Sequence, residues 1–270
     1  LPHRPPGPEP SNDRSCASYS RRAWAVEASG EGVRAVVTPR RRVSHPLPFP
    51  IPFAQVLPTP SPNFPQPPAP PGGSVPSISD LISNSGKHAE HDGPSQVVRF
   101  GGGWLVGFDI GEYGGSLWWS PSASTPGTKL LSDNVRTVLP LPNGVEALVF
   151  VGIQHMSSDL GRVFSVRSQP GRPKVSPLLD LGTQPHAVLL EDQGSVLVLT
   201  DHQLHRLWPD GRLLDVCAVD TSRLFPESIS VSGTGQIYLG MRHYIARLTP
   251  GKAGAACSVE WFVPQDCPVF

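Results

Sequence analysis

The chain has 270 residues, enough for one large or two small domains, and its 22 basic and 22 acidic residues give a formal net charge of zero. With no basic face evident after residue 42, this balance argues against nucleic acid as a partner of the second half of the chain. The longest apolar run there, around Val145 to Ile153, contains Glu146 and is too short to cross a bilayer, so we expect no membrane span.

The first part of the chain is set apart by its proline content. Twenty of the 33 prolines lie at or before Pro94. Because proline lacks an N–H and fixes φ, it excludes helices and central strands, and we predict a disordered proline- and arginine-rich segment or linker over residues 1–93. The alternatives are a docking segment for an aromatic-lined groove, or an upstream region that is not a genuine part of the protein. The fragment from Trp24 to Val37 could form a stray hairpin, which would be marginal alone.

The chain after residue 93 repeats itself. Four units share the order strand, glycine turn, strand, and each begins nine positions before a glycine. The second unit is the longest, and its extra residues fall between Val151 and Arg162. The units start, with offsets of 41, 50 and 41 residues, at Pro94, Val135, Pro185 and Pro226.

Each unit reads as four short apolar and β-branched runs separated by turns. Glycine supplies the φ > 0 that tight hairpin turns need, as at Gly144, Gly194 and Gly211. A period of 40 to 50 residues with four short strands is the signature of a β-propeller. We therefore predict an all-β propeller of four-stranded antiparallel blades over residues 94–270, with about four blades visible. The run from Ser258 to Val263 is predicted to be the outer strand of the last blade.

The repeated units resemble the blades of NHL-type and gluconolactonase-like propellers. The stretch from Gly107 to Trp119 resembles bacterial propeller-repeat proteins. The resemblance covers residues 94–270 and implies a fold without implying a reaction. Six or seven blades are usual in those relatives, so either this propeller is small or the chain is a fragment, and the total blade number stays open.

The repeat also predicts which side chains share one end of the blades. In a propeller, the loops that lead into the first strand and those that join the second strand to the third lie on the same face, and binding residues concentrate on such loops. The long insertion of the second unit falls on this face as a loop from Gly152 to Gly161. We expect the ligand-binding face to carry Asp109, Glu112, Tyr113, Arg136, His155, Asp159, His186, His202, Glu227, Arg242 and His243. The alternative for each of them is an ordinary solvated side chain.

Two functional interpretations follow, and the sequence does not decide whether the protein is an enzyme. The first is a non-enzymatic scaffold that binds a small molecule or a protein and needs no cofactor, because no nucleophile elbow, zincin, P-loop or dinucleotide pattern is present. The second, implied by the gluconolactonase-like resemblance, is a metal-dependent lactonase or other hydrolase with a divalent cation such as calcium. Its candidate ligands are Asp109, Glu112 and Glu227. Those relatives also use an asparagine, and no loop asparagine is evident on the same face.

The four cysteines bear on the compartment. Cys257 and Cys267 could form a disulfide in an oxidising compartment, or be two ordinary thiols. Cys217 follows a turn and is expected to be buried in an outer strand rather than reactive. We expect a secreted or periplasmic bacterial protein, although no signal peptide is visible in a chain that begins at Leu1.

Overall fold

The computed structural model describes residues 23–29, 32–38, 96–122, 127–155, 158–222, 224–241, 245–251 and 254–262. These belong to two compact units, Gln66–Asp220 and Thr221–Phe270 together with Leu1–Pro65. Arg242, His243, Cys267 and most of residues 1–93 lie outside the described residues. The predictions made for them, disorder of the first segment included, therefore stay predictions.

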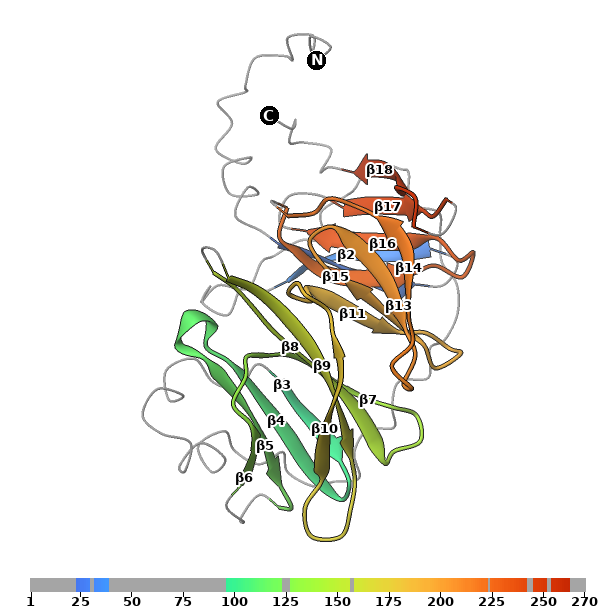
Figure 1. Cartoon of the computed structure of the whole chain (residues 1–270). Helices are drawn as coiled ribbons and strands as arrows, with labels where there is room; N and C mark the ends of the chain where they lie inside the picture. The colour runs from blue at the N-terminus through green and yellow to red at the C-terminus, as the bar shows by residue number, and fades with distance from the viewer. Residues whose placement is uncertain are drawn as a thin grey trace. The chain divides into compact units, whose positions relative to one another are not determined.

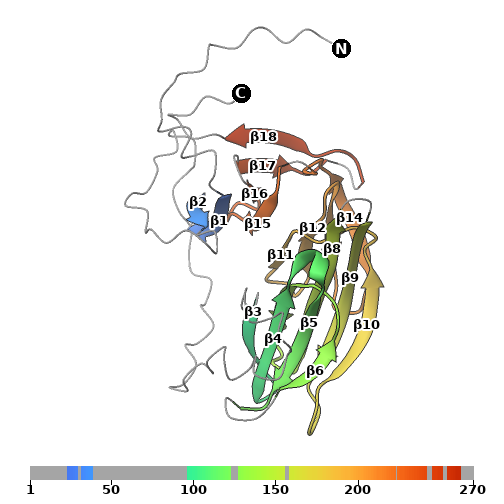
Figure 2. The ribbon, with the colours of Figure 1, turned by 90° about the vertical axis from the view of Figure 1, so that its left-hand side faces the viewer.

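In the described part of the unit Gln66–Asp220, here the three-sheet unit, there are three sheets of four antiparallel strands, each with its strands adjacent in chain order. The first sheet, whose strands follow one another in Figure 2, consists of β3 (Gln96–Phe100), β4 (Gly103–Asp109), β5 (Gly115–Ser120) and β6 (Thr128–Leu131). The second consists of β7 (Val135–Pro140), β8 (Glu146–His155), β9 (Ser158–Arg167) and β10 (Lys174–Asp180). The third consists of β11 (Ala187–Leu190), β12 (Val196–Leu199), β13 (Gln203–Leu207) and β14 (Leu213–Ala218). A short 3₁₀ turn, η1 (Gly111–Tyr113), joins β4 to β5.

The other unit, here the one-blade unit, contains in its described part the fourth four-stranded sheet, labelled in Figure 1. Its strands are β15 (Pro226–Val231), β16 (Ile237–Met241), β17 (Ile245–Thr249) and β18 (Ser258–Phe262). The fragment suspected of hairpin formation does form one, from β1 (Ala23–Ser29) and β2 (Gly32–Thr38). The hairpin is not isolated, because β1 lies against β15 and β16, and such packing supplies what a lone two-stranded hairpin lacks.

The four sheets correspond one to one with the four sequence repeats, which confirms the prediction of four-stranded antiparallel propeller blades. The predicted outer strand of the last blade is β18, which pairs with β17. The three turn glycines behave as expected, since Gly144, Gly194 and Gly211 have φ of 69°, 80° and 90°. At these angles a side chain would be strained, so the glycines set where each hairpin reverses.

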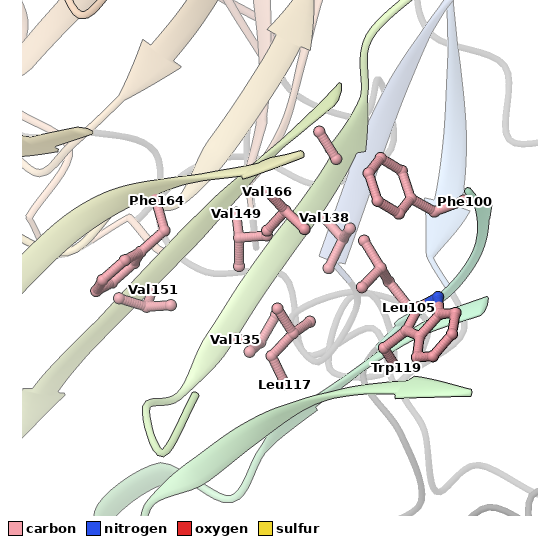
Figure 3. Close-up of a cluster of buried hydrophobic side chains, with 11 residues drawn as sticks. Phe100, Leu105, Leu117, Trp119, Val135, Val138, Val149, Val151, Phe164 and Val166 are labelled. Carbon is pink, nitrogen blue, oxygen red and sulfur yellow. The ribbon is translucent and has the colours of Figure 1, made fainter. Parts of the chain in front are cut away.

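The core of the three-sheet unit is built from strands that are buried on both faces. Along β8, Ala147, Val149 and Val151 belong to one hydrophobic cluster with side chains of the first sheet. The alternate residues Leu148 and Phe150 belong to another cluster with side chains of the third sheet. Figure 3 shows the first of these clusters, in which side chains of the two sheets meet. A strand covered on both faces needs a continuous apolar run rather than alternation, which is what the sequence has here.

The insertion in the second repeat differs from the prediction of a loop. Its residues lengthen β8 and β9, which stay paired from Glu146 opposite Arg167 to His155 opposite Ser158. The reason is that the two halves of the insertion can continue the antiparallel ladder, which satisfies their backbone N–H and C=O groups. The result is a long β8–β9 hairpin at the end of the sheet where the functional face was predicted.

Both described cysteines are in disulfide bonds. Cys217 is fully buried in β14, as expected, and it is disulfide-bonded, as is Cys257. The predicted Cys257–Cys267 pairing stays a prediction. Within the described part of the chain, no helix has the length and apolar character that a bilayer crossing requires.

Candidate functional site

The predicted face lies where the first strand of each blade begins and the second strand ends. Strand pairing places these positions together, since Gln96 lies opposite Gly107 and Ala187 lies opposite Leu199. In the three-sheet unit this end carries eight of the residues proposed for the ligand-binding face. We call this end of the three-sheet unit the candidate face; it carries Asp109, Glu112, Tyr113, Arg136, His155, Asp159, His186 and His202.

An ion pair joins the first and second blades at this face. The Asp109 carboxylate at the end of β4 accepts a hydrogen bond from Arg136 Nη1 on β7 at 2.5 Å. The other carboxylate oxygen accepts the N–H of Gly111 at 3.1 Å, which helps to shape the turn before η1. Both side chains remain partly exposed, at 31% for Arg136 and 18% for Asp109. The pair therefore fixes the loop and still leaves both charged groups accessible to solvent.

A second pair, between His186 and Asp201, is almost completely buried. His186 Nε2 lies 2.7 Å from Asp201 Oδ1, and the two side chains are 9% and 4% exposed. Because an ionised carboxylate can only accept, the His186 Nε2 carries a proton and donates it to Asp201. Gln154 donates to the other Asp201 oxygen, so the carboxylate is held from two elements.

The charge state of His186 is set by its burial. Burial lowers the pKa of His186, and the nearby positive charge of Arg136 lowers it further, while Asp201 and Asp159 act in the opposite direction. The net direction is downward, so His186 is neutral near pH 7 and keeps Nδ1 as an acceptor. Arg136 and Asp159 are thus close enough to His186 to influence its pKa electrostatically.

The η1 turn is tied to the long β8–β9 hairpin. His155 Nε2 near the tip of the hairpin lies 2.8 Å from Glu112 Oε2, with both side chains more than 40% exposed. Next to it the Tyr113 ring is 78% exposed, and a hydrogen bond to Glu112 raises the pKa of its hydroxyl. This part of the face therefore combines an exposed aromatic ring with a solvent-accessible contact between an imidazole and a carboxylate.

The two remaining predicted residues of this unit have different surroundings. The Asp159 carboxylate accepts the backbone N–H of Gln184 at 2.7 Å, so it anchors the chain that leads into β11. His202 lies 3.4 Å from Asp220, and both side chains are largely exposed. His202 is thus an edge residue of the face, whereas Asp159 supports its interior.

Sequence reasoning missed three polar residues of this face. Asn134 lies just before β7, on the face where no asparagine was expected, but it is buried, and its amide bonds to the backbone of Ile110 and Gly111. Gln154 and Asp201 are the partners in the buried network around His186. The strand register could have identified Asp201, because Asp109 and Asp201 occupy equivalent positions in their blades. Asp109 lies two residues after Gly107, the partner of Gln96, and Asp201 lies two residues after Leu199, the partner of Ala187.

The candidate metal ligands do not form a cluster in the three-sheet unit. Asp109 is paired with Arg136, and Glu112 is paired with His155. Glu227 is an exposed residue of β15 in the one-blade unit. Among the residues that the structure describes, no group of three or more His, Cys, Asp or Glu side chains is placed to hold a metal ion. The metal ligand set stays a prediction.

A cavity of about 200 Å³ opens beside the ion pairs. It lies between the η1 turn and the β6–β7 connection on one side and the β8–β9 hairpin on the other, and Glu112, Asp133, Ile153, Leu160 and Arg162 are among its lining residues. Asp133 and Arg162 form an ion pair of 2.6 Å across it. The cavity thus has both charged and apolar walls.

No protein-family model matches the sequence, and no curated protein matches it significantly. Among solved structures, a gluconolactonase from Xanthomonas campestris is similar to this chain, with 11% identity and a TM-score of 0.39. The match covers 64% of this chain and 57% of the gluconolactonase. This chain thus spans less than two thirds of that protein. A protein of unknown function from Bacteroides caccae matches 91% of this chain over 74% of its own length, with 13% identity and a TM-score of 0.40. At these values neither similarity assigns a ligand or a reaction to this chain.

Proposed function

We propose that the protein is a non-enzymatic binding module that holds a small polar ligand on the candidate face. The observation that carries this proposal is the Asp109–Arg136 ion pair, which links two blades and leaves both side chains partly exposed. Partly exposed, fixed donors and acceptors can recognise a polar ligand without chemical activation. The Glu112–His155 pair is a second partly exposed contact between the first two blades, and it joins η1 to β8.

The same pairs weigh against the hydrolase interpretation. A divalent cation held by carboxylates would have to compete with Arg136 for Asp109 and with His155 for Glu112. Calcium takes six to eight oxygen ligands in proteins, so it would need several such groups at once. A calcium-dependent lactonase is therefore the less favoured alternative.

The location we propose is a secreted or periplasmic one. Cys217 and Cys257 are both disulfide-bonded, and stable disulfides belong to oxidising compartments. Burial of Cys217 within β14 fits a structural bond rather than a catalytic one.

The proposal is tested by screening a library of small polar compounds against the ¹⁵N-labelled full chain by NMR. We expect bound compounds to shift the amide signals of Asp109, Arg136 and His186. The variant Arg136→Gln should weaken binding, whereas Asp192→Asn, an exposed acid in the turn at the opposite end of the third blade, should not. Binding confined to the opposite turns around Gly144, Gly194 and Gly211 would contradict the assignment of the face.

A further inference from the structure

The cavity near the tip of the β8–β9 hairpin has a mixed lining that indicates one class of ligand. One wall, from η1 and the β6–β7 connection, contributes the carboxylates of Glu112 and Asp133. The opposite wall contributes the apolar side chains of Ile153 and Leu160, and Leu160 is 59% exposed. An exposed leucine at the mouth of a cavity offers apolar area that a ligand could cover.

Arg162, the guanidinium among the described lining residues of the cavity, is already held by the protein. Arg162 Nη2 donates to Asp133 Oδ1 at 2.6 Å, and its Cζ lies 5.6 Å from the centre of the Phe164 ring, within the range of a cation–π contact. Arg162 therefore balances one carboxylate of the lining and leaves the cavity with a formal excess of one negative charge, counting Glu112, Asp133 and Arg162. His155, which is not among the lining residues, contacts the Glu112 carboxylate.

The carboxylates and the apolar wall of the cavity together favour a ligand of a particular charge and shape. An anionic ligand would meet two carboxylates, and a neutral one would gain no ionic attraction. A cationic group on an aliphatic chain would place its charge between Glu112 and Asp133 and its methylene groups against Ile153 and Leu160. The volume of about 200 Å³ lies below the range of roughly 300–1,000 Å³ found for drug-sized ligands, so the ligand must be short.

We propose that this cavity binds a short alkylammonium ion. The inference rests on the proposed function, because the cavity is part of the candidate face, and it adds the chemical class of one ligand. The ammonium group donates to the carboxylates of Glu112 and Asp133, and the alkyl chain covers Ile153 and Leu160.

The probe is n-pentylamine, a cation near neutral pH, compared with 1-pentanol and pentanoate, which have the same carbon chain. With the full chain, pentylamine should raise the midpoint of thermal unfolding by mass action, and the alcohol and the acid should not. Glu112→Gln and Asp133→Asn should each weaken pentylamine binding about fivefold, the effect of losing one partly exposed ionic contact. Asp192→Asn, in the turn after β11 at the opposite end of the third blade, is the control and should leave the affinity unchanged.

An equal response to pentanol or pentanoate would overturn the inference, and so would pentylamine binding that neither lining variant weakens. An absence of any pentylamine response would overturn it as well. If the compound screen still finds ligands near Asp109 and Arg136 in that case, only the cavity assignment fails. If that screen also finds nothing on the face, the proposed function fails with it.

Discussion

Asp109 and Asp201 occupy equivalent positions at the ends of β4 and β12, yet they differ in burial and in the residue that pairs with each carboxylate. Asp109 is partly exposed and is paired with Arg136 of the next blade. Asp201 is buried and is paired with the neutral His186 of its own blade. One repeat position therefore provides an accessible charged pair in one blade and a buried structural network in another. This difference separates residues available for a ligand from residues that hold the face together.

The buried pair predicts a pH-dependent stability. Because burial lowers the pKa of His186 in the folded protein, the unfolded chain takes up the His186 proton more readily. This contribution to stability is fully present above about pH 6.5 and is lost as the pH falls toward the folded-state pKa. The variant His186→Gln keeps an N–H donor for Asp201 without titrating. Urea unfolding at a series of pH values should show a shallower loss of stability for this variant below pH 6.5.

The matched control for this experiment is His202→Gln, since His202 is exposed at the edge of the same face. It should lose stability with falling pH as the unmodified protein does. Equal pH profiles for His186→Gln and the unmodified protein would show that His186 is not the titrating group.

The ion pair between the first two blades should contribute a small and measurable coupling. Asp109→Asn keeps an oxygen that can accept from the Gly111 N–H and removes the charge that pairs with Arg136. In a double-mutant cycle with Arg136→Gln, we expect a coupling free energy of about 0.5 kcal/mol, typical of partly exposed pairs. Strictly additive effects in chemical denaturation would mean that the pair does not connect the blades energetically.

Gly161 of β9 should not tolerate even a methyl group. A Cβ at this position would lie 1.8 Å from the backbone oxygen of Thr183, in the segment that leads to His186. We expect Gly161→Ala to destabilise the protein by roughly 1–3 kcal/mol through overpacking, measured by chemical denaturation. Gly127→Ala is the control, because a Cβ there would lie at an ordinary 3.5 Å from Trp118. A similar loss for both variants would contradict a specific steric requirement at Gly161.

The predictable parts of this protein are those set by local pattern and by repetition. The apolar run from Ala147 to Val151 indicated a strand, and Gly144 marked the turn before it. The repeat then located the end of the blades where Asp109 and Arg136 meet. Sequence reasoning could not show that the amide of Asn134 binds the backbone of Gly111, 23 residues away. Such contacts depend on the three-dimensional placement of loops.

A related limit explains the choice of His202 over Asp201. The two are neighbours in sequence, and the prediction of the ligand-binding face included His202 and not Asp201. Burial separates them in the structure, since Asp201 points into the network with His186 and Gln154 while His202 lies in solvent. Which of two adjacent polar residues faces inward depends on a register that the polar loop itself does not encode.

The central claim, that the candidate face binds a ligand without a catalytic metal, is tested most directly by thermal unfolding of the full chain. The protein is first measured in excess EDTA, and calcium, zinc or manganese is then added back. A metal that binds the folded state must raise the midpoint by mass action. We predict a cooperative transition whose midpoint does not change with any of the three metals, and no hydrolysis of a lactone in their presence. A metal-specific rise that Asp109→Asn abolishes, accompanied by lactone hydrolysis, would contradict the account and establish the hydrolase interpretation.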